Sequence, residues 1–177
     1  MNRILVLGIG NPLLSDDGAG IVCLAWLRRD HPPADGVVYH ETGALDLSFV
    51  TALTCCQRLL VVDAGRTGDA PGTVHLLEGE AMDRMVACRG RTAHEIGLGD
   101  LLDLARLTGW QPPVERALIA IEPASLAWGA RLTPAVAAAV PFAARLAMAV
   151  VQRWSHEDDG SGSPRSSLAT ASHAAAP

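Results

Sequence analysis

Apolar residues along the chain fall into short continuous runs that alternate with longer periodic stretches. The short runs are rich in Leu, Ile and Val and are bounded by Gly, Pro or polar residues, which predicts buried strands. They lie at residues 3–8, 37–41, 58–63, 73–77 and 117–121. The periodic stretches predict helices at residues 16–29, 45–53, 80–86, 92–108 and 133–154. Pro141 should kink or interrupt the last helix, because proline lacks the amide hydrogen that a helix interior needs.

This alternation of strands and helices predicts one three-layer α/β domain. We expect a mostly parallel sheet of about five strands with helices on both faces. The pattern stops near Trp154, after which Ser, Ala, Gly, Asp and Pro dominate and no aromatic residue occurs. We therefore expect a folded domain at residues 1–154 and a disordered tail at residues 155–177.

Composition and charge exclude several classes of protein. Of the 177 residues, 49% are hydrophobic and 19% charged, and the formal net charge is −5. Arg28 and Arg29 form the longest basic run, so we predict no nucleic-acid surface. The most apolar stretch, residues 135–151, contains Pro141 and Arg145 and is shorter than the roughly 20 residues that cross a bilayer, so we predict no membrane span.

The first residues favour a cytoplasmic location. The apolar run that follows Arg3 stops at Gly8, too early for the core of a signal peptide. In the cytoplasm, cysteines are reduced, and we interpret the cysteines of this chain as buried structural thiols. They are Cys23, Cys55, Cys56 and Cys88.

Polar residues that could carry chemistry follow the predicted strands. In an open α/β sheet, ligands bind beyond the carboxyl ends of the strands. Asp16 and Asp17 follow the first strand, Asp63 ends the third, and His94 lies at the start of a helix. Two carboxylates and one imidazole suit a metal ion, and the helix dipole would keep His94 neutral, as a metal ligand must be. The alternative is that the aspartates only cap a helix and hydrogen-bond a loop.

A nucleotide site is disfavoured by the loop after the first strand. Gly8 and Gly10 begin a dinucleotide-binding pattern, but Leu13 stands where the third glycine is needed. The two aspartates before the helix would repel a pyrophosphate. A P-loop requires a lysine, and all basic residues of this chain are arginine. A nucleotide-binding regulator therefore remains only an alternative.

Five segments, in order and with matching spacing, resemble the hydrogenase maturation endopeptidases. They are residues 8–20 (GIGNPLLSDDGAG), 63–64 (DA) with 71–72 (PG), 94–98 (HEIGL), 121–126 (IEPASL) and 132–136 (LTPAV). The resemblance extends over about residues 3–154. One segment alone would be weak evidence, but the ordered set is specific.

The resemblance implies an endopeptidase that removes a short C-terminal extension from the precursor of a nickel–iron hydrogenase large subunit, after nickel has been inserted. The residues of the family that contact nickel match Asp17, Asp63 and His94. Nickel would be carried by the substrate, and thiolates of the precursor would complete its coordination. Some members have Glu in place of Asp17, which changes the reach of the carboxylate but not its role.

Two further functions are alternatives: a non-catalytic chaperone that senses nickel on the same precursor, and a peptidase of similar fold with another substrate. Among other conspicuous residues, we interpret Glu41 and Asp46 as surface or capping carboxylates. Glu122 is a candidate cleft residue, and Trp128 lies in a predicted loop where it could touch a partner. His75 matches no motif.

Overall fold

The computed structural model describes residues 3–42, 52–88, 98–107 and 109–158. Its strands are β1 (Ile4–Ile9), β2 (Val37–Thr42), β3 (Arg58–Ala64), β4 (Val74–Glu78) and β5 (Glu115–Ile121). Its helices are the short 3₁₀ helix η1 (Ser15–Gly18), α1 (Ala19–Asp30), α3 (Glu80–Cys88), α4 (Leu98–Leu107) and α5 (Pro134–Asp158). The predicted single α/β domain is confirmed.

The strands form one five-stranded sheet in the order β2-β1-β3-β5-β4. β1 is parallel to both β2 and β3, β3 is parallel to β5, and β4 runs antiparallel to β5 at the edge. β4 runs in the opposite direction because only a short loop separates it from β3, too short for the crossover that a parallel strand requires. The sheet is therefore mostly parallel, as predicted.

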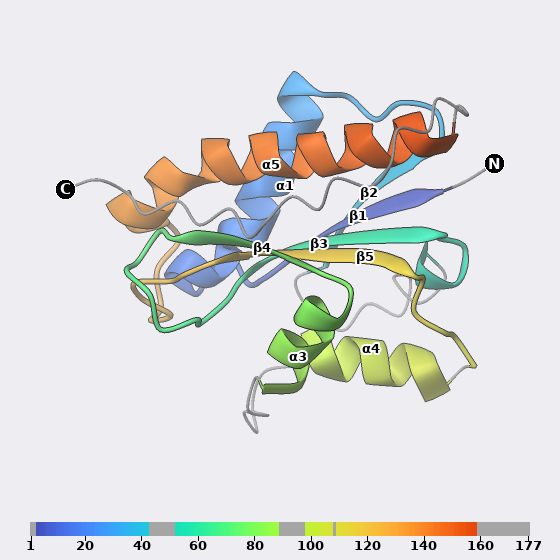
Figure 1. The fold of residues 1–177 in the computed structure, drawn as a ribbon. Coiled ribbons are helices and arrows are strands. Elements are labelled where there is room, and N and C mark those ends of the chain that lie inside the picture. Colours follow the sequence, from blue (N-terminus) through green and yellow to red (C-terminus); the bar gives the residue numbers. More distant parts are fainter. Residues whose placement is uncertain (1–2, 43–51, 89–97, 108, 159–177) are drawn as a thin grey trace.

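Helices cover both faces of the sheet. α1 and α5 lie on one face, and α3 and α4 on the other (Figure 1). Each face of the sheet has its own hydrophobic core, and successive residues of β3 point into the two cores alternately. Leu60 and Val62 face α1 and α5, whereas Leu59 and Val61 face α3 and α4. Burial on both faces explains why β1 and β3 are continuous apolar runs in the sequence.

α5 differs from the prediction at two points. It continues through Pro141 as one helix and ends at Asp158 rather than near Trp154. Buried residues on both sides of Pro141, including Val140 and Ala143, pack against the sheet and α1, which offsets the hydrogen bond that proline removes. The first four residues of the predicted tail, 155–158, are thus helical, and the expectation of disorder is wrong for them. Residues 159–177 lie outside the described part.

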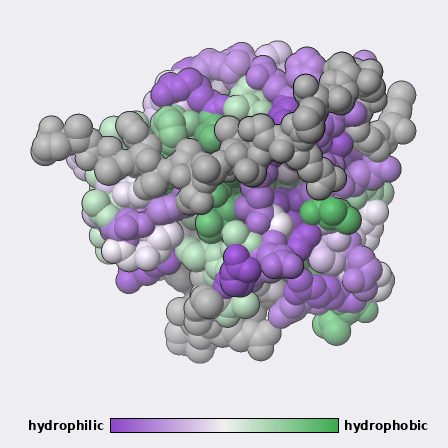
Figure 2. All heavy atoms as spheres, in the orientation of Figure 1, coloured by the Kyte–Doolittle hydropathy of each residue, from purple (hydrophilic) through white to green (hydrophobic). Residues whose placement is uncertain are grey.

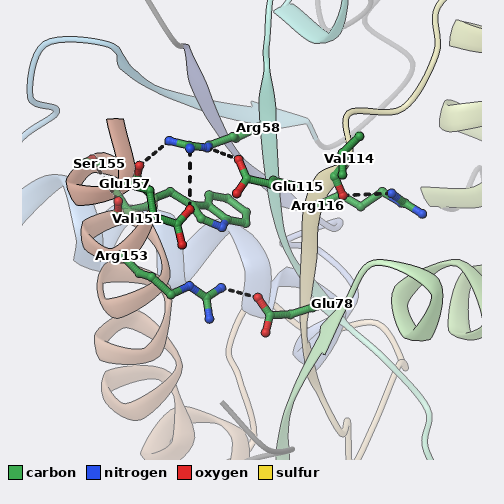
Figure 3. A network of polar contacts seen from close by, with 10 residues as sticks. Arg58, Glu78, Val114, Glu115, Arg116, Val151, Arg153, Ser155 and Glu157 are labelled. Atoms are coloured by element: carbon green, nitrogen blue, oxygen red, sulfur yellow. Dashed lines mark hydrogen bonds and ion pairs between the residues drawn. The ribbon is translucent and has the colours of Figure 1, made fainter. Parts of the chain in front are cut away.

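Arg58 attaches the end of α5 to the amino edge of the sheet (Figure 3). This buried side chain donates hydrogen bonds to Glu115 on β5 and to the carbonyl oxygen of Trp154, and its guanidinium lies 3.7 Å from Glu157. These contacts depend on the last turn of α5, so they explain why the helix extends beyond the apolar pattern.

By length and composition alone, residues Pro134–Glu157 form a helix that could cross a membrane. The sequence did not indicate this, because Pro141 was expected to divide the stretch. In the fold, this helix supplies buried residues to the core between α1 and the sheet. Such packing is the arrangement of a core helix.

The cysteines do not all follow the prediction. Cys23 is buried, but Cys55 is exposed and Cys56 is partly buried. Burial raises the pKa of the Cys23 thiol to about 12 and that of Cys56 to about 11. The expectation of burial is wrong for Cys55, which lies in the exposed turn that precedes β3. The side chain of Cys88 is outside the described residues.

The molecular surface shown in Figure 2 has no single character: small groups of hydrophobic residues lie among hydrophilic ones.

Candidate active site

Two glycines allow the start of α1 to pack closely against the carboxyl ends of β1 and β3. Gly10 follows β1 with a φ of +139°, and a Cβ atom there would lie 1.8 Å from the carbonyl oxygen of Asp17. A Cβ atom on Gly20 would lie 2.3 Å from the carbonyl oxygens of both Ile9 and Val62. Only glycine allows these approaches. They place η1, which carries Asp16 and Asp17, directly at the carboxyl edge of the sheet.

Asp16 is fully buried, and its carboxylate binds the loop between β5 and α5. Its Oδ2 accepts hydrogen bonds from the backbone amides of Ala124 (2.9 Å) and Ser125 (3.0 Å) and from the Thr133 hydroxyl (2.9 Å). Its Oδ1 accepts one from the Thr133 amide at 2.6 Å. Four donors occupy this carboxylate, so its role is to fix the loop rather than to meet a ligand.

Asp17 is the neighbour whose carboxylate remains accessible. It is half-buried, and its Oδ2 accepts a hydrogen bond from the Asn11 amide at 2.6 Å. No described residue donates a hydrogen bond to Oδ1. The hydrogen bond from Asn11 orients the group and leaves one oxygen for a metal ion or a substrate. The structure thus distinguishes two adjacent aspartates that the sequence could separate only by resemblance.

Asp63 lies near the carboxyl end of β3, where it is buried and aligned with Ala120 of β5. By alternation along the strand it shares the face of Leu59 and Val61, which α3 and α4 cover. η1 packs against β3, so Asp17 and Asp63 belong to the same edge of the sheet. This agrees with the placement expected from the sequence.

His94, the third predicted ligand, lies outside the described residues, as does Asp46. The nearest described element after it is α4, which begins at Leu98 and leads back to the amino end of β5 (Figure 1). A helix in that direction begins on the carboxyl side of the sheet, the side of Asp63. Among the described residues, no three His, Cys, Asp or Glu side chains are grouped so as to hold a metal ion. A complete site therefore requires a ligand from elsewhere, and the position of His94 stays a prediction.

Glu122 immobilises the loop that follows Asp63. This buried residue comes directly after β5, and its Oε2 accepts hydrogen bonds from the Thr67 amide, the Thr67 hydroxyl (2.7 Å) and the Gly68 amide (3.1 Å). Its backbone carbonyl also accepts a hydrogen bond from the Gly72 amide at 2.8 Å. Glu122, interpreted from the sequence as a candidate cleft residue, thus supports the loop from within.

The same loop contains a histidine contact that the sequence analysis missed. His75 Nε2 lies 2.7 Å from Asp69 Oδ2, and the Thr67 hydroxyl lies 3.0 Å from the same oxygen. That hydroxyl has a single hydrogen, so it donates to either Glu122 or Asp69 at any moment. No motif connects these residues, and only the fold brings them together. Elsewhere, Glu41 is a surface carboxylate, as the sequence indicated, and in the structure it pairs with Arg28.

Comparisons with known proteins agree with this architecture. The family described as HycI, hydrogenase maturation protease, matches residues 22–150. The hydrogenase expression/formation protein HoxM of Cupriavidus necator is 32% identical over 152 residues, which cover 85% of this chain and 75% of HoxM. The hydrogenase 2 maturation protease of Escherichia coli is 30% identical over 151 residues, covering 85% of this chain and 91% of that protein.

Solved structures show the same fold. The hydrogenase maturating endopeptidase HybD from Escherichia coli superimposes with a TM-score of 0.75 at 30% identity, covering 85% of this chain and 93% of that one. The nickel–iron hydrogenase maturation protease HybD from Thermococcus kodakarensis has a TM-score of 0.65 at 27% identity, with 84% and 98% coverage. The family match, the similar relatives and the shared fold agree with one another. The chain therefore belongs to the hydrogenase maturation protease family.

Proposed function

We propose that this protease removes a short C-terminal extension from the nickel-loaded precursor of a nickel–iron hydrogenase large subunit, and that it recognises the nickel which the substrate carries. As a member of its family, the chain is a peptidase that processes the C-terminus of the large-subunit precursor. The nickel requirement and its ligands are the proposed part. The observation that carries them is the contrast at η1, where Asp16 is saturated and Asp17 retains an oxygen without a described donor.

Asp17, Asp63 and His94 are the proposed contacts to the metal. Two carboxylates and an imidazole leave coordination positions open, and thiolates of the precursor suit those positions because nickel accepts both imidazole and sulfur ligands. The enzyme alone would then hold nickel weakly, and the metal would join enzyme to substrate. When bound, nickel can polarise the scissile carbonyl or an attacking water.

The described cysteines give no support to a cysteine nucleophile. Only a thiolate attacks efficiently, and the raised pKa values of Cys23 and Cys56, about 12 and about 11, keep both thiols protonated near neutral pH. Cys55 and Cys56 precede β3, at the edge of the sheet opposite to Asp63. Carboxylates at the carboxyl edge are better placed to accept a proton from water. Free thiols also suit a reducing compartment, and we propose that the enzyme acts in the cytoplasm.

Processing of purified precursor tests this function. Precursor loaded with nickel, loaded with zinc, or left empty is incubated with the enzyme, and loss of the extension is measured by intact mass. We expect cleavage of the nickel form alone. Equal cleavage of the empty precursor would refute nickel recognition, whereas tight binding of the nickel form without any cleavage would favour the non-catalytic chaperone.

Substitutions test which residues contact the metal. Asp17→Asn, Asp63→Asn and His94→Ala should each lower the processing rate at least about a hundredfold, because each removes a metal contact. Asp30→Asn is the matched control, since Asp30 is an exposed carboxylate at the far end of α1. Near-normal cleavage by the triple variant would overturn the assignment.

A further inference from the structure

Two exposed apolar side chains lie on adjacent loops at the carboxyl edge. Trp128 is 82% exposed and Leu13 is 56% exposed. Leu14 and Gly129 form a parallel β-bridge, supported by hydrogen bonds from the Ser15 amide to the Gly129 carbonyl (2.7 Å) and from the Gly129 amide to the Leu13 carbonyl (2.9 Å). In a parallel bridge, the residues that precede each partner are also neighbours, so Leu13 and Trp128 lie next to each other.

These loops are held in place, so the exposure of the two side chains belongs to the folded conformation. Asp16 binds the loop of Trp128 through its hydrogen bonds to Ala124 and Ser125. The Ser15 hydroxyl donates a further hydrogen bond to the carbonyl oxygen of Arg131 at 3.0 Å. A tryptophan that a hydrogen-bonded loop holds exposed to solvent is typical of a residue that contacts a binding partner. Indole rings contribute strongly to the binding energy of protein interfaces.

An exposed cation follows Trp128 closely in the same loop. The side chain of Arg131, three residues after Trp128, is exposed and takes part in no ion pair between described residues. Because the chain as a whole carries a net charge of −5, this guanidinium is a local positive charge on an acidic protein. It favours a partner that presents a carboxylate beside an apolar side chain.

We propose that Leu13, Trp128 and Arg131 form a docking surface for the C-terminal extension of the hydrogenase precursor. An apolar side chain of the extension packs against Trp128 and Leu13, and a carboxylate of the same segment pairs with Arg131. The surface lies close in the chain to the proposed metal site, since Leu13 and Asp17 both belong to the segment between β1 and α1. The inference rests on the proposed function, because it names where the substrate of that function binds.

Steady-state processing of the nickel-loaded precursor tests the surface. Trp128→Ser and Leu13→Ser should each raise KM about tenfold or more and leave kcat nearly unchanged, because they remove binding without touching the reacting groups. Arg131→Gln should raise KM less and abolish most of its dependence on salt. Circular dichroism and the melting temperature should match the wild type for all three variants.

The chain offers matched controls at other places. Leu107 and Val114 are 85% and 83% exposed but flank the amino end of β5, and Arg145 is an exposed arginine on α5. Leu107→Ser, Val114→Ser and Arg145→Gln should leave KM unchanged. An unaltered KM in Trp128→Ser and Leu13→Ser would overturn the docking surface while the proposed function stands. A wild-type enzyme that leaves the nickel-loaded precursor uncut would refute the function and the surface together.

Discussion

Asp16 and Thr133 are 117 positions apart in the chain, and two hydrogen bonds join them. The backbone amide of Thr133 donates to Asp16 Oδ1 at 2.6 Å and its hydroxyl donates to Oδ2 at 2.9 Å. Thr133 immediately precedes α5, so a single buried carboxylate attaches the start of α5 to η1. The neighbouring Asp17 is thereby held at the carboxyl edge without contributing to this attachment.

Replacing Asp16 should therefore affect stability, and replacing Asp17 should affect activity. Asp16→Ala leaves four donors without their acceptor, and we expect the free energy of unfolding to fall by about 3 kcal/mol. Asp17→Asn should change it by less than about 1 kcal/mol, because this half-buried carboxylate accepts one described hydrogen bond. Urea unfolding of both variants measures the difference. Equal destabilisation would contradict the separation of roles.

Glu122 should act on catalysis through the loop that follows Asp63. In Glu122→Ala, the amides of Thr67 and Gly68 lose their acceptor, so their hydrogen exchange should accelerate. We expect kcat for precursor processing to fall about tenfold with a smaller change in KM. Glu122→Gln retains an oxygen acceptor and should recover part of the rate. Exchange at these amides that stays at the wild-type level would show that the loop does not depend on Glu122.

Gly20 and Gly99 both lie in helices but should respond oppositely to alanine. A Cβ atom at Gly20 would meet two backbone oxygens at 2.3 Å, which cannot move aside, so Gly20→Ala should destabilise the fold by about 3 kcal/mol or more. At Gly99 the nearest atom is Val86 Cγ1 at 3.4 Å. Gly99→Ala should be neutral or stabilise by up to about 1 kcal/mol, because alanine is the better helix former. Thermal unfolding of the two variants compares them directly.

The Asp83–Arg116 ion pair should contribute stability only above acidic pH. Arg116 donates hydrogen bonds to both oxygens of Asp83, which lowers the pKa of that carboxyl below its ordinary value of 3.8. The contribution is present above pH 3.8 and disappears as the pH falls through the lowered folded-state pKa. Asp83 is 40% exposed, so solvent screening keeps the effect below about 1 kcal/mol. Urea midpoints of Asp83→Asn and wild type should differ at pH 7 and converge as the pH falls below the lowered pKa of Asp83.

Thiol labelling should separate the cysteines by burial. Exposed Cys55 should react with iodoacetamide in the native state, whereas Cys23, whose pKa burial raises to about 12, should react only after unfolding. Peptide mapping by mass assigns each modified site. Rapid native labelling of Cys23 would show that α1 opens readily.

Local sequence was sufficient to predict the fold class and the strands β1 and β3, whereas the helix predicted at residues 45–53 and the first part, 92–97, of the helix predicted at residues 92–108 lie largely or wholly outside the described residues. β1 and β3 were placed to within about a residue, because strands buried on both faces must be continuous apolar runs. Gly109, with a φ of +85°, follows the end of α4 as its position in the sequence predicted. Asp17 and Asp63 were assigned to one edge of the sheet because the ends of parallel strands meet there.

The tertiary structure alone decided the relationships between distant segments. Contacts between elements far apart in the chain determine three features. These are the direction of β4, the extension of α5 to Asp158 and the support of the loop after Asp63 by Glu122. The same holds for the difference between Asp16 and Asp17, which have the same side chain at adjacent positions. Hydrophobic periodicity and secondary-structure propensity describe residues that are neighbours along the chain. The hydrogen-bond partners of a buried carboxylate depend instead on which distant loop the fold places next to it.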